Sequence, residues 1–299
     1  MKLLPLALVG VAVASLVRTA VRDCSCLSSE DREILRHLSI VYLDDGAGGT
    51  AKTIRLRNAN LQVVNGLNHT ETSNGLGNII IGYHEPEVPI FFERTGSHYL
   101  VIGTDHQYTS YAGIVAGQES NALAPYASVL GGKANDATGE YASVSGGEGN
   151  CAEGISASVS GGSSNHATGI LSSVSGGWAA RANGLLSCVS GGQCNLAIGD
   201  YSWVGGGEKG SATGFGSTVS GGGRDLTAPV SGSDINVASG RWSAVFGGAG
   251  NHAEGRDSVV CGGFQNEAHG ELSTVTGGFQ ASVTGLYDWR AGACQFCED

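Results

Sequence analysis

Pairs of hydroxyl side chains recur along the second half of the chain, one on each side of a Val. Ser143 and Ser145 flank Val144, and the same arrangement returns fifteen residues later. Alternate residues of a strand point to the same face, so these hydroxyls are expected to form an outward Ser/Thr array. Such an array could order water and contact ice or a polysaccharide; a solvated polar sheet face is the competing interpretation. The predicted array comprises Ser143, Ser145, Ser158, Ser160, Ser173, Ser175, Thr218, Ser220, Thr274 and Thr276.

Catalytic motifs do not accompany these hydroxyls. The chain has no G-x-S-x-G, H-E-x-x-H or G-x-x-x-x-G-K segment, and no His or Asp recurs beside the Ser residues. We therefore expect a protein that is not an enzyme and needs no cofactor. The array itself is irregular, because its columns are interrupted by Cys188, Trp203, Pro229, Phe246 and Val259.

Four residues near the C-terminal end could ligate a metal. His252 and Glu254 are followed fifteen residues later by Glu267 and His269, which predicts stacking of His252 over Glu267 and of Glu254 over His269. Metal binding needs ligand atoms about 2.1 Å from the ion, and outward strand side chains seldom converge so closely. The sequence therefore favours a checkerboard of opposite charges and predicts no metal site.

Large apolar residues recur at the corner before each Val. A soluble monomer seldom leaves a continuous apolar ridge in water, so the corner either lies under a loop or packs against another chain. We expect self-association along this ridge, which gives the protein a second copy of itself as a partner. The ridge consists of Ile155, Ile170, Leu171, Leu185, Leu186, Tyr201 and Phe215.

A fifteen-residue repeat determines where all these residues fall. It is plain in YASVSGGEGNCAEGI (141–155) and in the two segments that follow it. The step between positions 219 and 230 is four residues short, which predicts eleven coils, one of them truncated. The Val that anchors each repeat lies at 129, 144, 159, 174, 189, 204, 219, 230, 245, 260 and 275.

Constant and variable positions alternate within each repeat, as expected for strands with one restricted face. Each coil therefore carries two short strands, around Val144 and around Ala152 in the repeat at 141–155. Equivalent strands of stacked coils lie about 4.8 Å apart. The predicted fold class is all-β, a parallel two-sheet β-solenoid with Val, Ala and Gly inside. A recurrent Asn near each turn is expected to satisfy buried backbone groups with its amide.

The beginning of the chain has a different pattern. Lys2 and the apolar segment 3–13 are typical of a secretory signal, with an uncleaved anchor as the alternative. Ser28 and Asp31 predict the start of a short helix over 28–39, and degenerate coils are expected near 78–82 and 100–103. The predicted organisation is a signal peptide (1–20), an N-terminal cap that protects the first strand edges (21–110), the solenoid (111–286) and a cysteine-containing tail (287–299).

Charge and cysteine content limit the partners and the compartment. The net charge of −11 argues against a nucleic-acid partner. Eight Cys behind a signal sequence favour an extracellular or cell-surface location. Coil spacing puts Cys151, Cys188 and Cys261 beyond disulfide reach of one another, and Cys188 and Cys194 lie on opposite strands of one coil. All four are therefore expected to be unpaired: Cys151, Cys188, Cys194 and Cys261. The terminal pairs, Cys24 and Cys26 against Cys294 and Cys297, are likewise too far apart, which leaves a local bridge or a link between molecules.

The unit Ser-Val-Ser-Gly-Gly-x-x-Asn-x-Ala-x-Gly, over roughly residues 55–292, resembles a family of secreted bacterial and algal repeat proteins. It is also similar to the β-roll heads of trimeric autotransporter adhesins and to some algal ice-binding proteins. The likeness to the adhesins implies surface attachment by a trimer, and the likeness to the algal ice-binding proteins implies binding to ice. We therefore expect a secreted, non-enzymatic structural or adhesive solenoid that binds surfaces or glycans through its sheet faces, with ice binding through the Ser/Thr array as the alternative.

Overall fold

The computed structural model describes residues 27–83, 85, 93–223 and 234–292, which fall into two compact units, 1–62 and 63–299. The predicted signal sequence lies outside the described residues, as do the four terminal cysteines. Within the described ranges, every helix is too short or too polar to cross a bilayer.

The first unit contains the predicted helix and an antiparallel pair of strands. Helix α2 (Ser29–His37) begins at Ser28, whose hydroxyl accepts a hydrogen bond from the Asp31 backbone N–H while the Asp31 carboxylate accepts one from the Ser28 backbone N–H. This capping box confirms the predicted start of the helix. Strands β1 (Leu38–Asp44) and β2 (Thr50–Leu56) follow and pair with each other.

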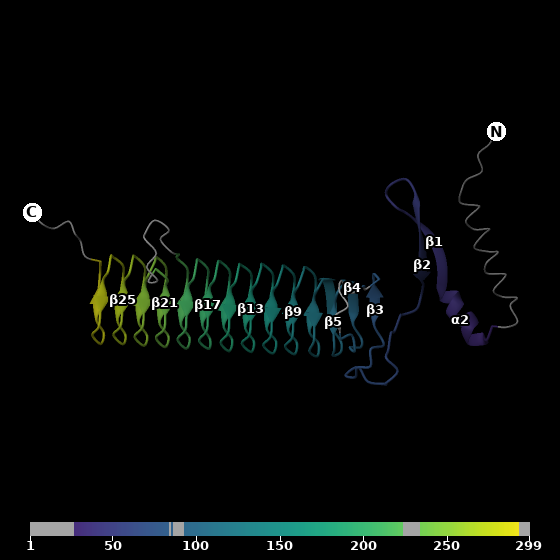
Figure 1. Cartoon of the computed structure of the whole chain (residues 1–299), viewed down its shortest axis with the longest axis horizontal. Helices are drawn as coiled ribbons and strands as arrows, with labels where there is room; N and C mark the ends of the chain where they lie inside the picture. Colours follow the sequence, from purple (N-terminus) through teal and green to yellow (C-terminus); the bar gives the residue numbers. More distant parts are fainter. Residues whose placement is uncertain (1–26, 84, 86–92, 224–233, 293–299) are drawn as a thin grey trace, which may run out of the picture. The chain divides into compact units, whose positions relative to one another are not determined.

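The second unit is a parallel β-solenoid made of a 14-stranded and a 12-stranded sheet (Figure 1). The 14-stranded sheet contains, in spatial order, β3 (Ile79–Ile81), β4 (Leu100–Thr104), β6 (Ile114–Gln118), β8 (Ser128–Val129), β10 (Ser143–Val144), β12 (Ser158–Val159), β14 (Ser173–Val174), β16 (Cys188–Val189), β18 (Trp203–Val204), β20 (Thr218–Val219), β22 (Ala244–Val245), β24 (Val259–Val260), β26 (Thr274–Val275) and β28 (Trp289–Arg290).

The 12-stranded sheet contains β5 (Gln107–Tyr108), β7 (Asn121–Ala122), β9 (Asp136–Ala137), β11 (Cys151–Ala152), β13 (His166–Ala167), β15 (Arg181–Ala182), β17 (Leu196–Ala197), β19 (Ser211–Ala212), β21 (Val237–Ala238), β23 (His252–Ala253), β25 (Glu267–Ala268) and β27 (Ser282–Val283). Two short strands per repeat, each paired with its equivalent in the next coil, confirm the predicted fold class.

The solenoid interior is built from the two columns that the repeat holds constant. The Val column of one sheet and the Ala column of the other are almost completely buried. Small side chains fill this narrow space because backbone from successive coils passes close by. At Gly154, for example, an added Cβ would overlap the carbonyl of Gly169 in the next coil. The predicted degenerate coils are also present, as β3 and β4, and the coils from Val101 to Val129 are each one residue shorter than the later ones.

The recurrent Asn side chains satisfy buried backbone groups, as predicted. They form a ladder of hydrogen bonds along the solenoid, in which each side chain bonds to main-chain groups and not to the next Asn side chain. Nδ2 of Asn150 donates to the carbonyls of Gly146 and Gly162 (2.9 and 3.0 Å). Its Oδ1 accepts from the backbone N–H of Asn165 in the next coil (3.0 Å). Each Asn therefore ties its own turn to the following one, which couples neighbouring coils.

The prediction of a truncated coil at Val230 is wrong. Val230 lies outside the described residues, and Val245 is the direct sheet neighbour of Val219. Nδ2 of Asn236 donates to the Gly221 carbonyl fifteen residues earlier. The equivalent bond from Asn150 reaches back four residues, so this coil contains eleven additional residues and is not shortened.

Candidate binding faces

The predicted Ser/Thr array lies on the outward face of the 14-stranded sheet. Ser143, Ser158 and Ser173 are aligned partners on three adjacent strands, and the buried Val beside each one leaves its hydroxyl facing outward. The second Ser of each pair is exposed. These six residues form one contiguous surface, here called the Ser patch: Ser143, Ser145, Ser158, Ser160, Ser173 and Ser175.

The remaining members of the array do not join this patch. Cys188 and Trp203 separate Ser173 from Thr218 along the same column. The Trp203 indole donates from Nε1 to Oγ of Ser190 (3.1 Å). The pairs Thr218–Ser220 and Thr274–Thr276 therefore lie elsewhere on the same sheet, each beside apolar neighbours.

The predicted apolar ridge is exposed along the corner that precedes each Val strand. Its members Ile155, Ile170, Leu171, Leu186 and Tyr201 are exposed over 43–49% of their surface, Phe215 over 36%, and Leu185 is half-buried. Within the described ranges, no loop covers them.

Aromatic residues extend this ridge at both ends. The Tyr126 ring packs between those of Tyr111 and Tyr141, with centroids 5.4 and 5.1 Å away. At the other end, the Phe215 ring contacts that of Trp242 at 5.1 Å. We call the seven ridge residues together with Tyr111, Tyr126, Tyr141 and Trp242 the corner stripe. The sequence reasoning missed these four aromatics, although Tyr126, Tyr141 and Trp242 fall in the repeat position of Leu171 and Tyr111 falls in that of Ile170.

Many stripe residues occupy a strained backbone conformation. Tyr141, Leu171, Leu186, Tyr201 and Trp242 have φ between 55° and 60°, the left-handed region in which Gly and Asn are favoured. A large side chain at such a turn costs about 1 kcal/mol or more. Ser156 and Asp257, outside the stripe, have a similar φ at the equivalent turn, so this conformation belongs to the corner of the coil. What distinguishes the stripe is its exposed large apolar side chains, which are typical of a surface used for binding.

The opposite face of the solenoid carries the predicted His and Glu group. Glu254 lies against His269 as predicted, with Oε2 2.8 Å from Nδ1, and Glu267 is 3.0 Å from Nε2 of the same ring. His252 is aligned with Glu267 in the sheet, but its nearest ionic partner is Glu254 of its own coil, at 3.6 Å. The hydrogen bond to Glu267, with the neighbouring Glu254, raises the pKa of His269. Both carboxylates are thus engaged in ion pairing.

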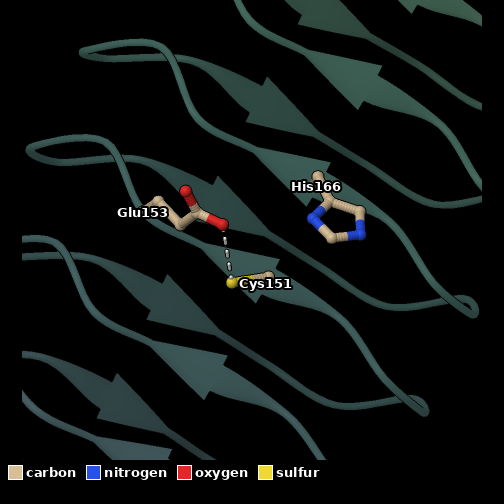
Figure 2. A group of neighbouring side chains, drawn as sticks. All are labelled: Cys151, Glu153 and His166. Carbon is tan, nitrogen blue, oxygen red and sulfur yellow. Dashed lines mark hydrogen bonds between the residues drawn. The ribbon is translucent and has the colours of Figure 1, made fainter.

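A second mixed group on this sheet was not predicted. Cys151 and His166 are aligned partners on β11 and β13, and Glu153 follows Cys151 on the same outward side (Figure 2). One ligand atom from each lies within 4.8 Å of the other two. The Cys151 thiol donates to Oε1 of Glu153 over 3.4 Å. Burial, followed by the hydrogen bond and charge of Glu153, raises the pKa of this thiol to about 12. The signal for this group was the fifteen-residue step from Cys151 to His166.

The four cysteines within the repeats are free, as predicted. Cys188 lies on the face of the Ser patch and Cys261 is exposed, so neither fills the core.

Compared with known proteins, the chain matches no protein-family model and no curated sequence.

Proposed function

We propose that the protein is a secreted, non-enzymatic structural or adhesive solenoid that binds surfaces or glycans through the Ser/Thr face of its 14-stranded sheet. The observation that carries the proposal is the one-to-one register of outward side chains: Ser143, Ser158 and Ser173 occupy equivalent positions on adjacent strands. Rows about 4.8 Å apart on a rigid scaffold present many weak hydrogen-bonding contacts at once. A repetitive polymer or surface is the ligand that suits such a face.

The hydrogen-bond partners of the Ser patch hydroxyls support a binding role over a catalytic one. Within the described ranges, no hydrogen bond joins a hydroxyl of the Ser patch to a His or a carboxylate. Activation of a Ser nucleophile requires such a base. The patch therefore offers donors and acceptors to a ligand but no activated nucleophile.

The corner stripe supports lateral self-association. It stays exposed over many successive coils, and a second copy would bring an equally long, equally apolar stripe against it. Light scattering should then give a mass above the 30.3 kDa of one chain. The double variant Leu171→Asp, Leu186→Asp should be monomeric, because Asp tolerates a left-handed turn but not an apolar contact. Leu130→Asp, at an exposed residue outside the stripe, should keep the larger mass, and a monomeric wild type would refute self-association.

Co-sedimentation with insoluble polysaccharides tests the binding role. The purified chain is mixed with cellulose, chitin and alginate gel, and the bound fraction is measured. Ser158→Tyr with Ser173→Tyr places two bulky rings on the Ser patch and should abolish binding. Thr168→Tyr with Asn183→Tyr makes the same change on the same two coils of the opposite sheet and should leave binding intact. Failure of the wild type to bind any of these polymers and any ice surface would overturn the proposal.

Ice binding is the second candidate function, and the Ser patch specifically favours it. Its two columns of outward hydroxyls keep the same register over three adjacent coils. If ice is the ligand, the wild type should show thermal hysteresis and inhibit ice recrystallisation, and the Ser158→Tyr, Ser173→Tyr variant should not. Binding to polysaccharide without either activity would exclude ice.

A further inference from the structure

From the arrangement of Cys151, Glu153 and His166 we infer a Zn²⁺ site on the outward face of the 12-stranded sheet (Figure 2). The site lies on the sheet opposite the Ser patch and is independent of the proposed binding function.

The distances are within reach of tetrahedral coordination. The three ligand atoms lie within 4.8 Å of one another. Around Zn²⁺, with bonds of about 2.0–2.3 Å, ligand atoms are roughly 3.3–3.7 Å apart. Glu153 is exposed and His166 is partly exposed, so rotation of these two side chains closes the remaining gap. The hydrogen bond from the Cys151 thiol to Glu153 already brings these two side chains together, and the bound ion would replace its proton.

The donor set selects the metal. Once metal binding has displaced the Cys151 proton, a thiolate, an imidazole and a carboxylate together suit Zn²⁺, whereas Mg²⁺ and Ca²⁺ take oxygen ligands. Three protein ligands leave a fourth position for water or for a further side chain.

Asp136 strengthens the case from the neighbouring coil. It is aligned with Cys151 on the side away from His166, so the column reads Asp136, Cys151, His166. One of its oxygens accepts a hydrogen bond from Nδ2 of Asn121 (2.7 Å), which orients the carboxylate. Two carboxylates, Asp136 and Glu153, thus flank the thiol and attract a cation.

Arg181 bounds the site on its other side. It is aligned with His166 in the following coil, and with His166, Thr168 and Asn183 it lines a surface hollow. The positive charge of Arg181 repels a cation from the hollow. The ion is therefore expected over Cys151, and the hollow is expected to hold none. The His and Glu group near the C-terminal end of the same sheet differs, because it has no Cys and both of its carboxylates contact His269 directly.

Cobalt substitution tests the site directly. Co²⁺ added to the full chain should produce the near-ultraviolet thiolate-to-cobalt absorption at one equivalent, and Zn²⁺ should displace it. Cys151→Ser should remove the band, and His166→Ala and Glu153→Gln should each weaken Zn²⁺ binding, measured by calorimetry, by about tenfold or more. Ser already occupies this column at Ser211, so the cysteine variant is compatible with the fold.

Matched controls separate this site from other ligands. Cys188→Ser removes a free thiol from the opposite sheet, and His252→Ala removes a His that faces carboxylates without a Cys. Both should retain the band and the affinity. All variants carry Ser in place of the four terminal cysteines, so that no other Cys pair binds Co²⁺. In that background, absence of the band from the chain that keeps Cys151, or its persistence in Cys151→Ser with unchanged circular dichroism, would overturn the assignment.

Discussion

Val219 and Val245 are direct neighbours in the 14-stranded sheet although they are twenty-six positions apart in the chain. The Asn236 side chain completes the same coil by donating to Gly221 and Gly248. The eleven additional residues therefore leave the stacking of the coils unchanged on both sides of them.

Deletion of residues 225–235 should preserve the solenoid. The shortened coil would again have fifteen residues, with Asn236 six positions after Val219. A shorter connection lowers the entropy cost of closing the coil, so the midpoint of thermal unfolding should stay the same or rise. Circular dichroism during heating measures this, and loss of cooperative unfolding in the deletion variant would contradict the assigned register.

Adjacent glycines should respond very differently to the same substitution. Gly162 has φ +85°, and an added Cβ would overlap the backbone carbonyl of Gly177. Gly162→Ala should therefore lower the free energy of unfolding by about 3 kcal/mol or more. At Gly161 a Cβ would meet nothing within 4 Å, so Gly161→Ala should change it by less than about 0.5 kcal/mol. Equal effects in denaturant titrations would show that the coils are not stacked as described.

The Asn ladder should contribute strongly to stability. Asn150→Ala removes three hydrogen bonds and leaves the backbone N–H of Asn165 and two carbonyls without that partner. At about 1 kcal/mol each, the loss should be about 2–4 kcal/mol in the free energy of unfolding. Asn183→Ala, at an exposed Asn outside the ladder, is the control and should be nearly neutral. A neutral Asn150→Ala would mean that the ladder does not stabilise the fold.

His269 should make stability depend on pH. Its pKa is raised above the ordinary 6.5 in the folded state, so its ion pairs with Glu267 and Glu254 stabilise the fold fully below pH 6.5. That contribution is lost as pH rises through the raised pKa. The stability difference between the wild type and His269→Gln should therefore shrink from pH 6 to higher pH, and NMR of the imidazole should show a lower pKa in Glu267→Gln. A difference that is constant with pH would contradict these ion pairs.

The repeat made the two sheets and their buried columns predictable. Constant and variable positions alternate around Val144 and Ala152, and this alternation indicates a strand at each place. The truncated coil at Val230 was wrongly predicted because Val-Ser-Gly at this place, with Asn236 six residues after Val230, has the same pattern as the repeat motif. The pairing of Val219 with Val245 and the hydrogen bonds of Asn236 distinguish an insertion from a shortened coil. The Cys151, Glu153 and His166 group was missed for another reason: its convergence depends on side-chain rotamers, which spacing alone does not specify.

The most direct test of the proposed function is hydroxyl-radical footprinting of the chain bound to the polysaccharide or ice surface that retains it. Aromatic and His side chains report three separate surfaces: Trp203 and Phe246 on the Ser/Thr face, Tyr201 and Trp242 on the corner stripe, and His269 on the opposite sheet. Binding through the Ser/Thr face predicts that Trp203 and Phe246 become protected while His269 does not. Protection of His269 with Trp203 and Phe246 unchanged would contradict it.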